Sequence, residues 1–452
     1  KPVVVTARRA SVLKKSYIHR ATLRRACGSV QGMESYELLI DGDRRSSSEA
    51  IHVANPATGE TVGRVAKGDA ADARAAIEAA DAVTRAWEDR SPAEYERPLR
   101  AVADRVEADA DDIAELLSKE TGKCLATAEG EVAETAAQFR FYAGVTDKVR
   151  GDTVPTAPNR LNYTRRVPYG VTAHVVPWNY PLLLGTRGIA SALATGNTVV
   201  VKPPTQAPLT TMWIGELLLE EFPDGVVNVV PGPGSEVGGE LSANAGVDAI
   251  TFTGSTGVGK GVLKSAAEHI TPVDLELGGK APSIVLPDAD LENAARGVVA
   301  GIFSNAGQNC VATSRCLVHE AVHDDLVEKI VEKTERITLG PGTDPETDMG
   351  PVISERARED VLSYVESAKE EGATLLTGGG VPDDPALAEG TFVEPTVFDD
   401  VDPSMTILVS PRWTGFPAGL SRKGSQGALM PDLERAGIGR LLLLPCAKMV
   451  GA

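Results

Sequence analysis

The sequence predicts an α/β fold in which helices cover parallel β-sheets. Between residues 169 and 275, short apolar runs such as TVVVK, VVNVV and DAITFT alternate with helical segments, which is the rhythm of βαβ units. A second alternation starts near Leu275, with APSIVL, a helix at LENAARGVVAGIF and the strand-like CLVHE. The 452 residues are too many for one core, so we expect two or three packed units.

The stretch 34–159 is predicted to be mainly helical. Asp69 is placed to cap an Ala-rich amphipathic helix. Ser91 followed by Pro92 marks the start of another helix, which should end at Gly122. These helices are expected to serve as scaffold.

The net charge of −18 is distributed unevenly. Residues 1–32 hold eight basic and no acidic residues, and residues 411–452 hold six basic and two acidic ones, so the intervening chain is strongly acidic. Such a surface repels phosphates, so we expect no nucleic-acid partner. No apolar run approaches the roughly 18 residues of a membrane-spanning helix, so we expect no membrane partner either.

The cysteines and the basic leader bear on the compartment. Five cysteines, scattered and odd in number, do not form the pattern of a secreted disulfide framework, so we expect a reducing cytoplasm. The stretch 1–32 lacks an apolar secretory segment, and we interpret it as a leader that is not native, with the natural start at Met33. A transit peptide would share its Arg-rich, acid-free composition. The cysteines are Cys27, Cys124, Cys310, Cys316 and Cys446.

Three familiar motifs occur in incomplete form. The run GSTGVGK from Gly254 has phosphate-loop spacing but carries Gly261 where a magnesium-binding Ser or Thr is needed, which disfavours an NTPase. The run Gly232–Gly238 nearly matches the dinucleotide fingerprint, with its last glycine one residue late. His319 and His323 have the spacing of a zinc protease. Because His319 ends a strand-like run, the two rings should diverge on the surface and bind no metal.

Four segments between Val176 and Cys310 carry the most specific pattern. They are PWNYP from Pro177, FTGSTGVG from Phe252, LELGGK from Leu275 and NAGQNC ending at Cys310. Together, and in this order, they resemble the aldehyde dehydrogenase superfamily of the NAD(P)-dependent, hydrolytic type. The resemblance extends from Tyr36 to Ile407 and includes NPATGE, DMGPVIS and FVEPTVF.

The resemblance implies an aldehyde dehydrogenase-like α/β fold and its division into domains. Residues 33–150 and 169–275 would form a parallel-sheet cofactor-binding domain, 151–168 a bridging pair of strands used in oligomerisation, and 276–408 an α/β catalytic domain. Residues 409–452 lack the family's Glu-Glu-Ile-Phe-Gly-Pro segment, as a shifted reading frame would produce. That segment would have held the nicotinamide ribose.

The resemblance assigns the chemistry to three residues. Cys310 attacks the aldehyde as a thiolate, hydride leaves as the carbonyl re-forms, and a thioester remains. Asn179 and the backbone N–H of Cys310 stabilise the oxyanion. Glu276 is the base for the water that releases the acid, and relatives that pass the acyl group to coenzyme A lack it. Outside these motifs we would interpret Cys310 as a packing cysteine, Asn179 as part of an Asx turn and Glu276 as a surface glutamate.

The same resemblance places NAD or NADP at the ends of strands. Gly254 and Ser255 open a helix whose free N–H groups attract the pyrophosphate, with Trp178 as a further phosphate contact. Lys202 would reach the adenosine ribose. Thr205 stands where NAD-preferring relatives often carry Glu, so either NAD or NADP would fit. The other expected cofactor positions are Gly259 and Gly278.

Arg187 departs from the family pattern, because relatives often carry an aromatic residue there, lining the substrate tunnel. A buried guanidinium needs an anion. We therefore hypothesise a substrate aldehyde that also bears a carboxylate, with pairing to a protein acid as the alternative. Intact relatives of the family assemble as homo-oligomers, which is the assembly that the resemblance implies.

Two other functions stay open at this point. A catalytically inactive remnant, or a nucleotide-binding protein of the same fold, would keep the cofactor and lose turnover. An acyl-transferring reductase would require coenzyme A. Aldehyde-dependent formation of reduced nicotinamide distinguishes an active enzyme from an inactive remnant or nucleotide-binding protein. A requirement for coenzyme A would identify the acyl-transferring reductase.

The acidic surface generates a prediction on salt. Either the carboxylates only keep the surface solvated, or the protein is halophilic and relies on counter-ions to screen their repulsion; we hypothesise the latter. Raising KCl from dilute buffer to molar concentration should then raise the midpoint temperature of unfolding, measured by circular dichroism. Full stability in dilute buffer with no gain in concentrated KCl would contradict the hypothesis.

Overall fold

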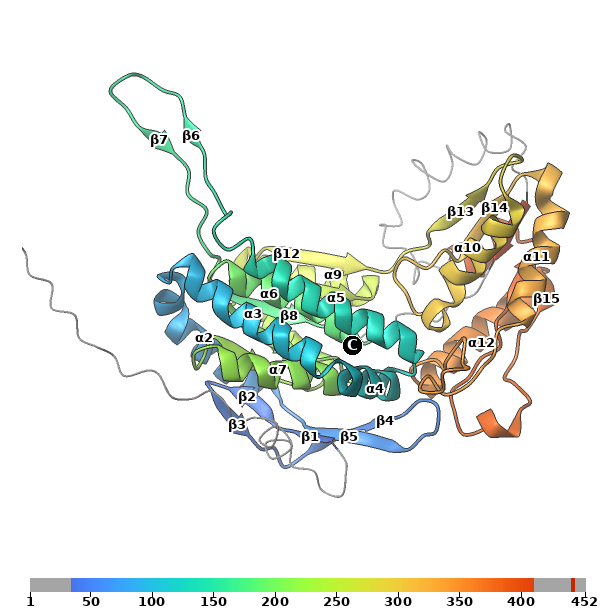
Figure 1. The fold of residues 1–452 in the computed structure, drawn as a ribbon, viewed down its shortest axis with the longest axis horizontal. Helices are drawn as coiled ribbons and strands as arrows, with labels where there is room; N and C mark the ends of the chain where they lie inside the picture. The colour runs from blue at the N-terminus through green and yellow to red at the C-terminus, as the bar shows by residue number, and fades with distance from the viewer. Residues whose placement is uncertain (1–33, 410–439, 444–452) are drawn as a thin grey trace, which may run out of the picture.

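The computed structural model describes residues 34–409 and 440–443. The predicted leader 1–32 and most of the predicted tail 409–452 therefore lie outside the described residues. Figure 1 shows a larger unit around one sheet, a smaller unit around a second sheet, and a narrow strand pair that projects from the larger unit. The predicted α/β class with a parallel sheet is confirmed. Within the described ranges, no helix has the length and apolar character needed to cross a membrane.

The sequence pattern predicted helices at the beginning of the described chain. This prediction is wrong there, because the chain forms five strands. An Asp-Gly turn joins the second and third, with φ of 58° at Asp41 and 79° at Gly42. The second strand is fully buried, yet strands of three residues are too short to show a period in the sequence. The strands are β1 (Glu34–Tyr36), β2 (Leu38–Ile40), β3 (Asp43–Arg45), β4 (Ala50–Ala54) and β5 (Thr61–Ala66).

Four helices follow, and their ends agree with local capping signals. α2 begins after Asp69, whose side chain accepts two first-turn N–H groups in a capping box. The helix predicted between Ser91 and Gly122 starts and ends there, but it breaks at Asp109 into α3 and α4. Gly122 ends α4 in the left-handed conformation, with φ of 80°. The helices are α2 (Ala70–Glu88), α3 (Pro92–Ala108), α4 (Ala110–Thr121) and α5 (Leu125–Ala143).

A seven-stranded sheet forms the larger unit. Five neighbouring strands run parallel in the order β12-β11-β8-β9-β10, and β2 and β3 extend the sheet antiparallel beyond β10. The chain runs outward from β8 through β9 to β10 and then returns to the other side of β8 at β11. The parallel strands are β8 (Val171–Val175), β9 (Thr198–Lys202), β10 (Val227–Val229), β11 (Ala249–Gly254) and β12 (Val273–Leu277).

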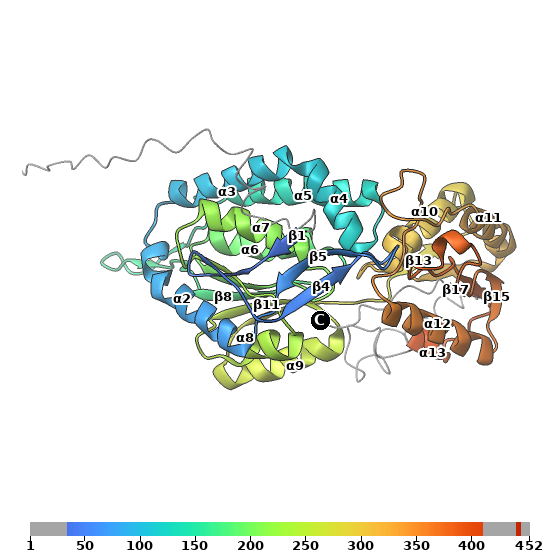
Figure 2. The same ribbon diagram turned by 90° about the horizontal axis from the view of Figure 1, so that it is seen from below.

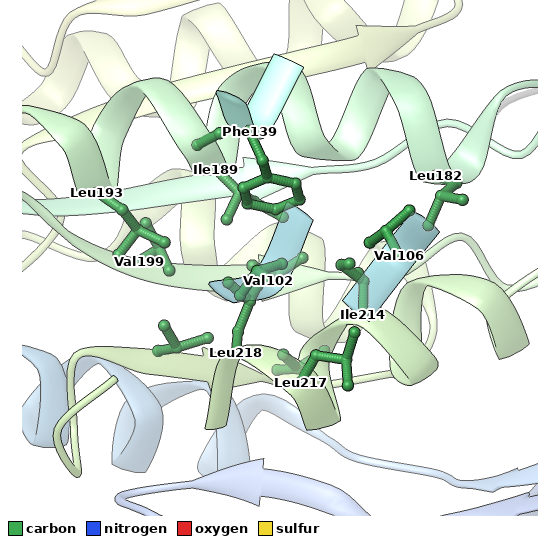
Figure 3. Close-up of a cluster of buried hydrophobic side chains, with 14 of the residues drawn as sticks. Val102, Val106, Phe139, Leu182, Ile189, Leu193, Val199, Ile214, Leu217 and Leu218 are labelled. Atoms are coloured by element: carbon green, nitrogen blue, oxygen red, sulfur yellow. The ribbon is translucent and has the colours of Figure 1, made fainter. Parts of the chain in front are cut away.

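Helices cover both faces of this sheet in a three-layer arrangement (Figure 2). α3, α5, α6 and α7 lie on one face, and α2, α8 and α9 lie on the other. Phe139 of α5 packs among aliphatic side chains of α3, α6, α7 and β9 in the core of the first interface (Figure 3). The helices between the strands are α6 (Pro181–Ala194), α7 (Leu209–Glu221), α8 (Gly239–Ala243) and α9 (Thr256–Ala266).

The second sheet has five strands in the order β13-β14-β17-β16-β15. The domain boundary expected at Glu276 falls inside β12, which pairs with β11 as far as Leu277, so the second unit begins later, at β13. Unexpectedly, β17 comes from the unmatched tail and pairs antiparallel with both β14 and β16. The elements are β13 (Pro282–Val285), α10 (Leu291–Phe303), β14 (Arg315–Val318), α11 (His323–Glu335), α12 (Glu355–Glu370), β15 (Thr374–Thr377), β16 (Val397–Asp399), α13 (Thr406–Val409) and β17 (Arg440–Leu443).

The projecting strand pair consists of β6 (Thr153–Val154) and β7 (Asn162–Tyr163), which pair antiparallel (Figure 1). Both strands lie in the stretch 151–168, where bridging strands were expected. Leu161 is 77% exposed and Tyr163 57% exposed, so the pair buries little of its apolar surface within this chain. Its role in oligomerisation stays a prediction.

His174, in the central strand β8, gives a prediction for stability. It is buried, its ring nitrogens lie 2.9 Å from the Thr172 hydroxyl and 2.8 Å from the Thr251 hydroxyl, and burial lowers its pKa from 6.5 to about 4. Between these pH values the unfolded chain binds a proton that the folded chain does not. The free energy of unfolding should therefore fall by up to about 3 kcal/mol as the pH decreases from 6.5 to 4.

Urea unfolding across this pH range measures the effect. The His174→Gln variant, which has no imidazole to protonate, should show a smaller decrease than the parent protein. Equal pH dependence in the two proteins would contradict the assignment.

Candidate active site

The candidate site lies at the carboxyl edge of the seven-stranded sheet. In open parallel sheets the ligand crevice forms where successive connections leave in opposite directions. Here that point lies between β8 and β11, because β8 connects to β9 on one side while β11 lies on its other side. The loops after these strands, and the ends of their neighbours, carry the predicted residues Trp178, Asn179, Lys202, Thr205, Gly254, Ser255 and Glu276.

Cys310 comes from the second unit, in a catalytic loop that we define as residues 304–310. Three consecutive residues before the cysteine, 305–307, have φ between 52° and 74°, so the chain reverses sharply after α10. Gln308 fixes the loop with both ends of its side chain. Its Nε2 donates to the carbonyl of Asn305 at 3.1 Å, and its Oε1 accepts from the N–H of Ile353 at 2.8 Å. The loop is therefore held by the protein rather than by a ligand.

Cys310 is half-buried beside the end of β12. A Cβ added at Gly279 would come within 3.3 Å of the Cys310 carbonyl, so the backbone that follows Glu276 passes next to the cysteine. Burial raises the pKa of the Cys310 thiol, the Glu276 carboxylate raises it further, and the Arg187 guanidinium lowers it. The two predicted catalytic residues thus share one electrostatic environment, in which the resting thiol is protonated at neutral pH.

Asn179 is bonded to the same loop. Its side chain is buried, and its Nδ2 donates to the carbonyl of Gln308 at 2.8 Å. This bond connects the loop after β8 to a residue two positions before Cys310. Since an amide nitrogen carries two hydrogens, the second is the candidate oxyanion donor. The structure therefore brings Asn179 to the catalytic loop.

Arg187 does not occupy the buried position that the sequence predicted. Its side chain is 42% exposed, and its Nη2 lies 3.2 Å from Oε1 of Glu276. The guanidinium has a protein partner, because α6 and β12 bring this acid within reach. The alternative of pairing to a protein acid holds, and the partner is the predicted base itself.

A cavity of about 340 Å³ opens beside this ion pair, between α6 and strands β8, β11 and β12. Arg187 and Glu276 line it, whereas Cys310 and Asn179 are not among its lining residues. Asn179 and Cys310 therefore meet at the catalytic loop, whereas Glu276 lines this cavity and acts on the Cys310 thiol through its charge. The other polar residues that line it are Tyr142, His174, Ser191, Thr251, Thr253 and Asp274.

Lys202 ends β9 and is fully enclosed. Its Nζ donates to the Pro203 carbonyl at 2.9 Å, and burial lowers its pKa to about 8. A lysine ammonium has three donors, so a hydroxyl-rich ligand could be bound by the others. In the following loop, the Thr205 hydroxyl donates to the Gly232 carbonyl at 3.3 Å and so connects the loops after β9 and β10.

The two glycines around the start of α9 are required by packing. A Cβ at Gly254 would lie 2.6 Å from the Phe252 ring, and one at Gly259 would lie 2.8 Å from the Leu277 side chain. The absence of a side chain at Gly259 therefore lets α9 lie close against β12, and its absence at Gly254 leaves room for the Phe252 ring of the same strand. This packing role differs from a close approach of the backbone to a cofactor, and neither distance is evidence for such an approach.

The remaining predicted cofactor residues have different surroundings. Ser255 caps α9, with its hydroxyl accepting from the N–H of Val258 at 3.4 Å. Gly278 has open space where a Cβ would be, so a group could approach its backbone. Trp178 is buried in an apolar cluster with side chains of the second unit, among them Ile353. It therefore connects the two units as well as following β8.

The histidine pair diverges, as predicted. Nδ1 of His319 accepts from the N–H of Ala321 at 3.1 Å in the turn after β14, while His323 starts α11. The expectation that both are surface residues is wrong for His323, which is buried between the carboxylates of Asp324 and Asp399. Among the described residues, no group of three or more side chains has the arrangement of a metal site.

Sequence reasoning missed a buried polar cluster next to Asn179. Lys123 and Glu131 form an ion pair with both side chains fully enclosed, and the Lys123 ammonium lies 4.0 Å from the centroid of the Tyr180 ring. The one local signal is an ionisable residue directly after the helix-ending Gly122. Glu131 lies inside a helix, and nothing in the sequence distinguishes it from an ordinary solvated acid.

Comparison with known proteins identifies the family. The sequence model of the Aldehyde dehydrogenase family matches residues 44–411. The chain belongs to the aldehyde dehydrogenase family. Betaine aldehyde dehydrogenase from Bacillus subtilis (strain 168) is 41% identical over 380 residues, which cover 83% of this chain and 78% of that protein. Alpha-ketoglutarate semialdehyde dehydrogenase from Haloferax volcanii is 42% identical over 364 residues, covering 80% and 75%.

Solved structures agree with this aldehyde dehydrogenase assignment. Betaine aldehyde dehydrogenase from Staphylococcus aureus in complex with NAD+ has a TM-score of 0.81 at 38% sequence identity, covering 82% of this chain and 75% of that one. The predicted superfamily, fold class and aldehyde-oxidising enzyme class are confirmed.

Proposed function

We propose that this aldehyde dehydrogenase converts an aldehyde and water to a carboxylic acid with Cys310 as nucleophile, Glu276 as base and Asn179 as oxyanion donor. One observation carries the proposal: the Asn179 amide is bonded to the catalytic loop, and the backbone after Glu276 runs beside the Cys310 carbonyl. Because the first sheet supplies two of these residues and the second unit supplies the third, the site exists only when both units pack together.

The chain's own groups account for the bonds and protons. The Cys310 thiol releases its proton to solvent water and its sulfur bonds to the carbonyl carbon, so the oxygen becomes an alkoxide that the Asn179 amide and the Cys310 N–H stabilise. As that oxygen re-forms its double bond, the hydrogen on carbon leaves as hydride and a thioester remains. Glu276 takes a proton from water, the water oxygen attacks the thioester, and the acid departs as the thiolate is regenerated.

NAD(P)+ supplies the hydride acceptor, and the related betaine aldehyde dehydrogenase was crystallised with NAD+. The sheet edge fits such a cofactor, because the enclosed Lys202 ammonium can donate to ribose hydroxyls and the first turn of α9 presents N–H groups to phosphate. Thr205 carries no charge, so that position does not select between NAD and NADP. We propose further cofactor contacts at Trp178, Gly254, Ser255, Gly259 and Gly278.

Arg187 supports a substrate that bears a carboxylate. It is partly exposed and lines a polar cavity together with Glu276. A substrate carboxylate could replace Glu276 as its partner, which would at the same time free the base for its reaction with water. A relative that is 42% identical is named for an aldehyde with one carboxylate group, alpha-ketoglutarate semialdehyde.

The setting of the enzyme is also a proposal. The scattered cysteines support a cytoplasmic location, and the acidic excess supports adaptation to high salt. The exposed apolar side chains of the β6–β7 pair support assembly into a homo-oligomer.

Replacing the nucleophile and the base should separate the two halves of the reaction. Cys310→Ala should lower aldehyde-dependent formation of reduced nicotinamide by on the order of a thousandfold or more, because no other group can form the thioester. Glu276→Gln should retain one rapid turnover per site and then slow by roughly a hundredfold, since only thioester hydrolysis needs the base. Rapid-mixing absorbance measures both phases.

The control for this pair is Cys316→Ala, at a buried cysteine in β14 whose pKa burial raises to about 12. It should retain turnover. Activity in Cys310→Ala would refute the nucleophile, and loss of the rapid phase in Glu276→Gln would refute its restriction to hydrolysis.

Arg187→Ala tests the substrate class. For an aldehyde with a terminal carboxylate, kcat/KM should fall by roughly ten- to a hundredfold, as expected for loss of a charge-assisted hydrogen bond. For the methyl ester of the same aldehyde, kcat/KM should change much less. The ratio of the two values cancels any general effect of the lost Glu276 contact, and an unchanged ratio would reject the carboxylate hypothesis.

A further inference from the structure

A buried ion pair lies next to the start of α6. Lys123 directly follows the left-handed Gly122, and Glu131 lies in the second turn of α5; both side chains are 0% exposed. Enclosing two charges costs several kcal/mol per ion, so such a pair persists only where its remaining polar atoms are bonded as well. Burial lowers the pKa of Lys123, and the Glu131 carboxylate opposes that shift.

Glu131 provides the cap that α6 lacks. The residue before the helix, Tyr180, makes no capping bond with its side chain. Instead, Oε1 of Glu131 accepts from the N–H of Leu182 at 3.0 Å and from the N–H of Leu183 at 3.1 Å. A carboxylate at this end satisfies free donors and interacts favourably with the helix dipole. Together with Pro181 at the first helical position, Glu131 thereby fixes the start of α6 and, with it, the two residues immediately before the helix.

Lys123 binds those two residues directly. Its Nζ donates to the backbone carbonyl of Asn179 at 2.8 Å, and the ammonium lies over the ring of Tyr180. The side chains of both residues in turn reach the catalytic loop. Asn179 bonds the carbonyl of Gln308, and the Ser304 side chain is near enough to the Tyr180 hydroxyl to oppose the rise of its pKa that burial causes. A chain of contacts therefore runs from the ion pair through Asn179 to the catalytic loop.

We propose that Lys123 and Glu131 are positioning residues that hold the Asn179 amide in the direction needed at Cys310, without touching substrate. The inference rests on the proposed function, which gives Asn179 its oxyanion role. The charges that act on the Cys310 thiol are those of Glu276 and Arg187, so the ion pair acts through geometry. Its loss should slow attack on the aldehyde and leave the reactivity of the thiol itself unaltered.

The double variant Lys123→Met/Glu131→Gln removes the charges without leaving one of them buried and unpaired. It should lower kcat by about tenfold or more, as removal of the oxyanion donor in Asn179→Ala should also do. The KM for NAD+ and the rate of Cys310 alkylation by iodoacetamide should change less than twofold. Hydrogen exchange measured by mass spectrometry should become faster in residues 176–184 and in the catalytic loop.

The matched control is Arg44→Met/Glu216→Gln, which removes a half-buried ion pair between β3 and α7. It should leave kcat and both exchange signals as in the parent. An unchanged kcat in a folded Lys123 variant, or an equal loss in kcat and alkylation rate, would overturn the proposal. If the parent protein does not turn over aldehyde, the proposed function fails. In that case the hydrogen exchange of the double variant and the parent protein tests the positioning role. Unchanged exchange in the catalytic loop would overturn it.

Discussion

Parallel strands that point the same way bring the loops after them to one edge of a sheet, and the chemistry of this chain depends on that edge. β8, β9, β11 and β12 end there with an amide, an ammonium, a helix start and a carboxylate. The reversal of strand order between β8 and β11 opens the space into which the catalytic loop of the second unit reaches. Nucleotide binding and the reaction with the aldehyde thus share one geometric origin.

Enclosed carboxylates give this edge its rigidity. Glu131 on α5 caps α6, and Glu120 on α4 caps α7 by accepting from the N–H groups of Leu209 at 2.7 Å and Thr210 at 3.0 Å. Burial raises the pKa of Glu120 to about 7, and its bonds to the helix start oppose that shift. Two helices on one face of the sheet are therefore started by acids from elements earlier in the chain.

These remote caps show where sequence reasoning ends. Asp69 and Gly122 act on their own helices, so their local patterns predict the ends of α2 and α4 correctly. The starts of α6 and α7 are capped by carboxylates about 50 and 90 positions away, and no local pattern reveals those caps. Likewise, the motif around Cys310 identifies the nucleophile, but the pairing of Arg187 with Glu276 depends on how α6 crosses the sheet.

The location of β17 has a consequence for synthesis of the chain. Its backbone separates β14 from β16, so until Arg440–Leu443 leaves the ribosome the smaller sheet consists of two unconnected pairs of strands. Such pairs are marginal in water and present open edges to other chains. The larger unit can form its core during translation, whereas the unit that carries the nucleophile is completed last and is the part most exposed to aggregation.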